Sequence, residues 1–202
     1  MLALAAGSAY ADPSDWSLSG GAGDSFSGYS APPVLSPVFS YGLVNPTITL
    51  SAQKPLQITF LGKEASNLNQ FWINGSLVLS SLAVAPSTYG PVSVDVGSLN
   101  FFFRDTTDGD QVANGGALAE YASYAILGFA GQGEFGGFTP WRGYSNEFDF
   151  VIGFNDGRTI DADYDDLVIG VTAVPEPSTY ALMAAGLLGV SFVARRRSRR
   201  NS

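Results

Sequence analysis

The residues best suited to chemistry in this chain of 202 residues form one acidic run near the C-terminus. Five carboxylates fall within eleven residues, between two apolar segments: Asp156, Asp161, Asp163, Asp165 and Asp166. Like charges this close repel one another unless a cation, backbone N–H groups or an arginine offsets them. Calcium accepts six to eight oxygen ligands from flexible loops, and carboxylates are prominent among them. The five aspartates are therefore candidate calcium ligands.

A second explanation of the acidic run needs no ion. Aspartate side chains bond the backbone of their own turn, so the same residues could shape a tight connection between two strands. The run also departs from the EF-hand loop, because the glycine and the glutamate of that pattern are not at their positions. Both explanations stay open. A further acidic group, Asp105, Asp108 and Asp110, follows another apolar run and would face the first if the two strands paired.

Part of the acidic run is similar to a known family. The segments 154–157 (FNDG) and 161–166 (DADYDD) resemble the end of a β-sandwich domain of unknown function found in calcium-rich bacterial adhesins. The likeness covers residues 154–170, and Asp165 stands where that family typically has asparagine. The resemblance implies that Asp161, Asp163 and Asp166 hold calcium or cap the loop.

Composition excludes several kinds of active site. The chain contains no cysteine and no histidine, so zinc sites of the usual kind and Cys–His or Ser–His–Asp nucleophilic sites cannot form. A hydrolase that uses only carboxylates is the remaining catalytic alternative, with Glu134, Glu147 and Asp149 as its candidates. Sugar binding is another alternative, because Trp72, Trp141 and Tyr144 could stack on sugar rings. We expect a protein that is not an enzyme.

Charge is divided unevenly along the chain. Residues 12–177 hold five basic and all 18 acidic side chains, which gives this segment a net charge of −13. The remaining arginines are Arg195, Arg196, Arg197, Arg199 and Arg200. An acidic surface of this kind repels nucleic acid, so we expect no nucleic-acid partner.

Short strands must position these residues. Apolar or alternating runs recur every 8–15 residues between turn residues, and Asn74-Gly75 is a strong hairpin signal. Residues 92–96 alternate as a strand would, whereas 121–129 could be strand or helix. We predict an all-β ectodomain of seven to nine strands, an antiparallel β-sandwich or jelly roll, over residues 31–173. The Gly- and Ser-rich segment 12–30 is either a lead-in or a first strand.

The N-terminal residues 1–11 predict a partial signal peptide. They are apolar and end in Ala9-Tyr10-Ala11, the small-residue pattern that precedes a signal cleavage site. Cleavage would fall between Ala11 and Asp12. The basic residues that normally begin such a peptide are missing.

The C-terminal residues 174–202 predict a tail with three parts. Pro175, Glu176 and Pro177 favour an extended linker, because proline fixes φ and removes a backbone donor. Residues 180–194 carry no charge and would form a helix about 22 Å long, somewhat short of the roughly 30 Å hydrocarbon core. The arginines at 195–200 follow at once and would remain on the cytoplasmic side, so the ectodomain would lie outside the inner membrane.

This order of Pro-Glu-Pro, short apolar helix and arginine cluster resembles the PEP-CTERM sorting signal of Gram-negative bacteria. The resemblance implies processing by an exosortase, a membrane protease that cuts near the motif. It also implies a host that makes exopolysaccharide, and a product delivered to the cell surface or biofilm matrix. We therefore expect a non-catalytic exported surface protein, held by its membrane helix before processing. The alternative is a carbohydrate-binding or calcium-dependent adhesive module.

Overall fold

The computed structural model describes residues 15–25, 41–117, 122–129, 148–157, 163–174, 185–188 and 190–191. Several predictions therefore fall outside the described residues. These are the signal peptide with Ala11 and Asp12, Pro175–Pro177, the arginines at 195–200, Asp161, Glu134, Glu147, Trp141 and Tyr144.

The prediction of an all-β, antiparallel fold is confirmed. The described residues contain fourteen strands in three sheets, and every strand pair is antiparallel. The first seven are β1 Trp16–Ser19, β2 Ala22–Ser25, β3 Tyr41–Val44, β4 Thr47–Leu50, β5 Lys54–Gly62, β6 Asn69–Ile73 and β7 Ser76–Ser80. The others are β8 Ser87–Val94, β9 Gly97–Ser98, β10 Phe101–Asp105, β11 Gln111–Ala113, β12 Ser123–Phe129, β13 Phe150–Asn155 and β14 Leu167–Ala173.

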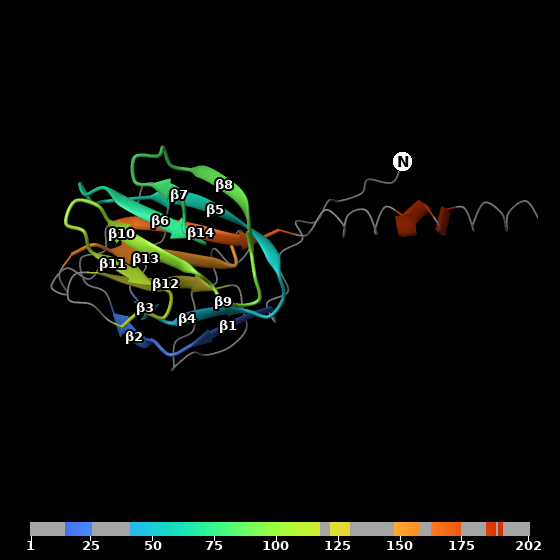
Figure 1. Cartoon of the computed structure of the whole chain (residues 1–202), viewed down its shortest axis with the longest axis horizontal. Helices are drawn as coiled ribbons and strands as arrows, with labels where there is room; N and C mark the ends of the chain where they lie inside the picture. Colours follow the sequence, from blue (N-terminus) through green and yellow to red (C-terminus); the bar gives the residue numbers. More distant parts are fainter. Residues whose placement is uncertain are drawn as a thin grey trace, which may run out of the picture.

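One large sheet forms a layer of the molecule, in the order β2-β3-β12-β13-β14-β5-β8. A four-stranded sheet, β11-β10-β6-β7, and a three-stranded sheet, β1-β4-β9, face it. Figure 1 shows β6, β7 and β10 lying over β5, β13 and β14. For residues 12–30, the structure shows strands at β1 and β2, and these pair with β4 and β3.

The core lies between the large sheet and the two smaller ones. Alternation in the strands directs one side chain in two inward, as in β13, where Phe150, Ile152 and Phe154 belong to this core. Phe103 of β10 stacks on Phe154, with ring centroids 5.2 Å apart and planes 7° from parallel. Trp16 of β1 meets Phe150 edge to face at 4.9 Å. Aromatic contacts therefore join the facing layers.

The outer face of the large sheet is also covered near its centre. Val151, Leu127 and Val168 form a second buried cluster there together with Tyr164. Tyr164 lies in the loop between β13 and β14 and has a positive φ of 60°, an uncommon conformation for a residue other than glycine. A Cβ on Gly153 would lie 2.1 Å from the carbonyl oxygen of Tyr164, so only glycine lets this loop rest on β13.

Predictions from short sequence patterns are confirmed where the structure depends on residues that are close in the chain. The Asn74-Gly75 hairpin is confirmed, with φ of 51° and 73° at the two turn residues. Residues 121–129, left open between strand and helix, contain strand β12. Val96 was placed in a strand wrongly, because β8 ends at Val94 and Val96 is 61 % exposed. The expected seven to nine strands are too few, since short strands of two to four residues such as β3, β9 and β11 carry little periodicity.

The C-terminal tail is described only at residues 185–188 and 190–191, which are helical. Leu187, Leu188 and Val190 are exposed in this segment. Among the residues that the structure describes, no helix is both long enough and apolar enough to span a bilayer.

Candidate functional site

The acidic run lies where three distant parts of the chain meet. Asp156 follows the end of β13 and Asp166 precedes β14, so both belong to one loop of the large sheet. In the facing sheet, Asn69 begins β6 and stands opposite Asp105 at the end of β10. The amide of Asn69 reaches across to the loop, which joins the two layers through polar groups.

We call Asn69, Asp156 and Asp166 the acidic junction. The backbone N–H of Asp156 donates to Oδ2 of Asp166 at 2.8 Å. Nδ2 of Asn69 donates to Oδ2 of Asp156 at 2.5 Å and to the carbonyl oxygen of Asp166 at 3.3 Å. The carboxyl groups of Asp156 and Asp166 are also close enough for the charge of Asp156 to raise the pKa of Asp166. The junction thus places two carboxyl groups and a carbonyl oxygen around one amide.

Electrostatics at the acidic junction disfavour two negative charges. Burial, followed by the charges of Asp156 and Asp163, raises the pKa of Asp166 from 3.8 to about 8, against the effect of the N–H bond from Asp156. Burial also raises the pKa of Asp156, and the charges of Asp105 and Asp108 add to the effect. Among the described residues, the charged side chains that act on these two carboxyls are acidic. A proton or a cation therefore stabilises the pair.

The second acidic group of the sequence does lie near the first, but not through strand pairing, because β10 belongs to the four-stranded sheet and the acidic run lies beside β13 and β14 of the large sheet. Asp105 and Asp108 interact electrostatically with Asp156 across the layers. Asp105 is fully buried, and its oxygens accept bonds from the N–H groups of Thr107 and Asp108 and from Nδ2 of Asn67, at 2.7, 3.3 and 3.0 Å. This carboxylate therefore shapes the turn after β10, as the turn explanation expects.

The amide of Asn69 is only partly satisfied. The side chain is 0 % exposed, and its Oδ1 accepts no hydrogen bond although that atom is buried. An unsatisfied buried carbonyl costs free energy and calls for a specific cause. Nothing in the sequence alone marked Asn69, because its role depends on the pairing of β6 with β10.

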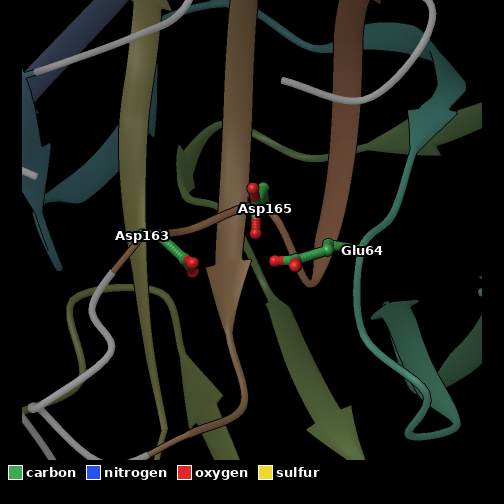
Figure 2. Close-up of side chains that lie close together, drawn as sticks. All are labelled: Glu64, Asp163 and Asp165. Atoms are coloured by element: carbon green, nitrogen blue, oxygen red, sulfur yellow. The ribbon is translucent and has the colours of Figure 1, made fainter. Parts of the chain in front are cut away.

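The remaining candidate ligands form a separate group, which we call the Glu64 cluster: Glu64, Asp163 and Asp165. One carboxylate oxygen from each lies within 4.8 Å of the others, and Figure 2 shows the three side chains converging from two segments. Asp163 and Asp165 are buried, whereas Glu64 is exposed. The N–H of Glu64 donates to the carbonyl of Asp165 at 2.9 Å. Sequence reasoning missed Glu64, which lies 99 positions before Asp163.

The structure thus divides the predicted calcium ligands between two places. Asp156 and Asp166 belong to the acidic junction, whereas Asp163 and Asp165 join Glu64. The two places are close enough for Asp163 to act on the pKa of Asp166. Asp161 lies outside the described residues, so its place relative to either group is not described.

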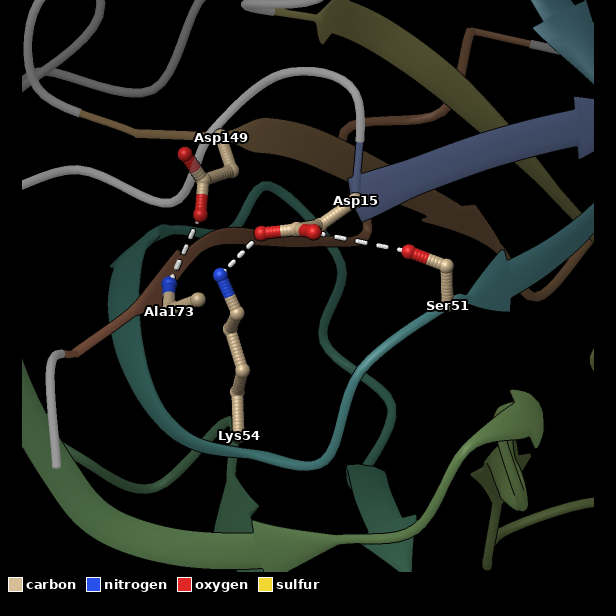
Figure 3. Close-up of polar contacts among 5 residues, drawn as sticks. All are labelled: Asp15, Ser51, Lys54, Asp149 and Ala173. Atoms are coloured by element: carbon tan, nitrogen blue, oxygen red, sulfur yellow. Dashed lines mark hydrogen bonds and ion pairs between the residues drawn. The ribbon is translucent and has the colours of Figure 1, made fainter.

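A third carboxylate of interest, Asp149, lies at the opposite end of β13. Figure 3 shows Asp149 accepting the N–H of Ala173, a bond of 2.7 Å, beside an ion pair between Lys54 and Asp15. Burial raises the pKa of Asp149 to about 6, and the N–H of Ala173 opposes this rise. Ala173 is the last residue of β14. Asp149, proposed as a hydrolytic carboxylate, therefore holds the end of the folded sheet.

A pocket of about 680 Å³ opens beside the β13–β14 loop. Its lining includes Asp24, Asn45, Ser123 and Tyr164, together with glycines of two turns. The hydroxyl groups of Ser123 and Tyr164 are bonded at 3.3 Å. Asn45 is 8 % exposed, and its Nδ2 is buried without a hydrogen-bond partner. Polar residues are therefore prominent among those that line the pocket.

The aromatic residue predicted to bind sugars lies elsewhere. Trp72 of β6 is half-buried and stacks on Phe102 of β10, with planes 10° from parallel, and its indole N–H donates to Gln70. Trp72 is not among the residues that line the pocket.

Comparisons with known proteins identify one segment of the chain. The PEP-CTERM protein-sorting motif matches residues 173–197. The chain therefore carries a PEP-CTERM sorting motif, which indicates an extracellular protein targeted to an exosortase. No curated protein and no solved structure matches the chain. The likeness of residues 154–170 to a calcium-adhesin domain has no support among these comparisons.

Proposed function

We propose that the chain is a non-catalytic protein of the extracellular matrix, sorted by an exosortase and associated with exopolysaccharide. The match of residues 173–197 to the sorting motif carries this proposal. The folded sheet ends at Ala173, where Asp149 holds the last strand and the N–H of Val174 donates to the carbonyl of Pro55 at 2.9 Å. The motif therefore begins where the folded ectodomain ends, which suits removal of the tail without unfolding.

Two features support a role without catalysis. The chain has no histidine or cysteine to act as a base or nucleophile. Asp149 binds the backbone of Ala173, and the acidic junction is held by hydrogen bonds among its own members. Asp149 is the one described carboxylate among the three candidates for hydrolysis, and it has this structural role.

The proposal is tested in a bacterium that makes exopolysaccharide and carries an exosortase. In the parent strain we expect a shortened chain in the matrix fraction, and in the exosortase deletion strain a full-length chain in the membrane fraction. The triple variant Pro175→Ala, Glu176→Ala and Pro177→Ala should behave in the parent as the wild type does in the deletion strain. Ser198→Ala with Asn201→Ala and Ser202→Ala, three changes just beyond the matched motif, is the control and should be processed normally. A shortened matrix form in the deletion strain would contradict the proposal.

A second candidate function is binding of a saccharide in the pocket. The observation that favours it is the polar lining of the pocket, which includes Asp24, Asn45, Ser123 and Tyr164. Sugar hydroxyls accept from amides and exchange bonds with hydroxyls and carboxylates. A pocket of this size also suits one or two sugar rings, because small-molecule sites commonly span about 300–1,000 Å³.

Titration calorimetry with oligosaccharides cut from the host polysaccharide tests this second candidate. Ser123→Ala should weaken binding about tenfold or more, since it removes a hydroxyl from a buried side chain of the pocket. Asp24→Asn should weaken binding less, since it removes only the charge of an exposed carboxylate. Asp95→Asn, an exposed carboxylate outside the pocket, should leave the affinity unchanged. Loss of binding in Trp72→Ala alone would place the sugar on the outer sheet face and exclude the pocket.

A further inference from the structure

We propose that the acidic junction binds a hard divalent cation, with calcium preferred, through the carboxylates of Asp156 and Asp166 and the amide oxygen of Asn69. The inference is independent of sorting and of the sugar-binding candidate. It concerns a different ligand set from the Glu64 cluster. Its basis is a pair of carboxyl groups held close together and a buried carbonyl oxygen that has no partner.

The first step of the argument is charge. The two carboxyl groups are held close together, because the N–H of Asp156 donates to Oδ2 of Asp166 and the amide of Asn69 donates to Oδ2 of Asp156. Asp105, Asp108 and Asp163 add further negative charge around them. Two carboxylates in such a setting cannot both ionise at low cost. A divalent cation neutralises both at once, which a single proton does not.

The second step is the unsatisfied oxygen. Asn69 is fully buried, and its Nδ2 contacts both Asp156 and the backbone of Asp166. Oδ1 is bonded to the same carbon as Nδ2, so it lies next to these groups, and it accepts no hydrogen bond. Coordination of a cation by Oδ1 removes the cost of leaving that oxygen buried and unpaired.

The third step is the type of ligand. The groups at the junction are carboxylate and amide oxygens, and the carbonyl oxygen of Asp166 lies beside them. Oxygen-only sets favour calcium, magnesium or manganese over softer metals. Calcium tolerates the irregular geometry of a loop and completes six to eight ligands with water, whereas magnesium demands a near-ideal octahedron. Calcium therefore fits a junction built from two strand ends and a loop.

The fourth step is structural placement. Asn69 belongs to the four-stranded sheet, and Asp156 and Asp166 belong to the large sheet. A bound ion would link the two layers at one end of the core. An ion that binds only the folded state raises the free energy of unfolding with the logarithm of its concentration above Kd. The cation should therefore stabilise the contact between the two sheets.

The experiment uses the full chain in detergent and measures the melting temperature with a chelator, with calcium and with magnesium. Calcium at about a hundredfold excess over Kd should raise the wild-type melting temperature by about 5–10 °C. Calorimetric titration should give one ion per chain. Asp156→Asn and Asp166→Asn should each abolish the calcium shift, and both should still fold because a neutral amide replaces a carboxyl that favours its neutral form. Asp95→Asn makes the same change in net charge outside the junction and should keep the shift.

Asn69→Asp should change the calcium shift in the opposite direction to the two Asp→Asn variants. A third carboxylate at the junction should lower the melting temperature in chelator and enlarge the shift that calcium produces. Asp163→Asn separates the junction from the Glu64 cluster and should keep a calcium shift. Absence of any calcium effect on the wild type would overturn the proposal. So would a shift that survives in Asp156→Asn and Asp166→Asn but disappears in Asp163→Asn, because the ion would then belong to the Glu64 cluster.

Discussion

The protonation of Asp166 is directly linked to the stability of the fold. Burial and neighbouring carboxylates raise the pKa of this group to about 8, far above the value of about 3.9 expected in the unfolded chain. The folded state therefore binds a proton that the unfolded state releases. Without a cation, the group stabilises the fold fully below about pH 4, and this stabilisation is lost as pH rises toward 8.

The first prediction follows from this loss of stability as pH rises. In chelator, Asp166→Asn should gain stability relative to wild type as pH rises from 4 to 8, because the amide carries no charge to bury. Urea unfolding at several pH values measures the difference in unfolding free energy between the two proteins. Asp95→Asn should run parallel to wild type over the same range. A difference between Asp166→Asn and wild type that does not change with pH would contradict the assigned shift.

The second prediction concerns Asp149. Asp149→Ala leaves the buried N–H of Ala173 without its acceptor, which should cost about 1–3 kcal/mol of unfolding free energy. Asp149→Asn keeps an oxygen acceptor and should remain closer to wild type. Urea unfolding of the two variants checks this. Equal stability of the alanine and asparagine variants would show that the Asp149–Ala173 bond does not stabilise the end of β14.

Candidate site residues could be identified from the sequence where they lie close together in one segment. The acidic run was found because its five aspartates are close in the chain. Asn69 and Glu64 could not be found, since their partners are about 90 to 100 positions away and only the tertiary fold brings them together. The division of the predicted ligands between the acidic junction and the Glu64 cluster could not be predicted for the same reason.

At the scale of elements, the contact between Gly153 in β13 and Tyr164 in the following loop sets the position of the acidic residues. The loop carries Tyr164 with a positive φ, and its carbonyl lies where a side chain on β13 would begin. Because the loop holds Asp163, Asp165 and Asp166, any displacement of Tyr164 moves both carboxylate groups.

The third prediction tests this contact. Gly153→Ala should destabilise the fold by about 2 kcal/mol or more, because the new methyl group overlaps backbone that cannot move freely. Any calcium shift should weaken in the same variant. Gly157→Ala is the matched control, since among the described residues its Cβ would meet Oδ1 of Asn155 at 3.4 Å, an ordinary contact, and nothing closer. A melting temperature for Gly153→Ala equal to that of the control would show that the loop tolerates displacement.

Elements with strong local signals were predicted, and elements fixed by distant pairing were not. The β6–β7 hairpin follows from Asn74-Gly75, whose residues take the positive φ that such turns need. In contrast, β9 and β11 have two and three residues. They pair with β4 and β10, and no alternation of so few residues marks a strand. Tertiary pairing decides such short strands.

At the scale of the whole molecule, a folded β ectodomain precedes a sorting motif. The sheets of the ectodomain are held together by aromatic contacts such as Phe103–Phe154 and by polar groups at the acidic junction. The motif at residues 173–197 starts at the last residue of β14. This tail was recognisable from sequence because a protease reads it as a linear segment, independently of the ectodomain fold.

The fourth prediction addresses sorting of the whole chain. The intact mass of the protein purified from the matrix of an exosortase-carrying bacterium measures where the chain ends. The proposed function predicts a mass that lacks the residues after the Pro-Glu-Pro motif, and a full C-terminus when the exosortase is deleted. A matrix protein that retains Arg195–Arg200 in both strains would contradict it.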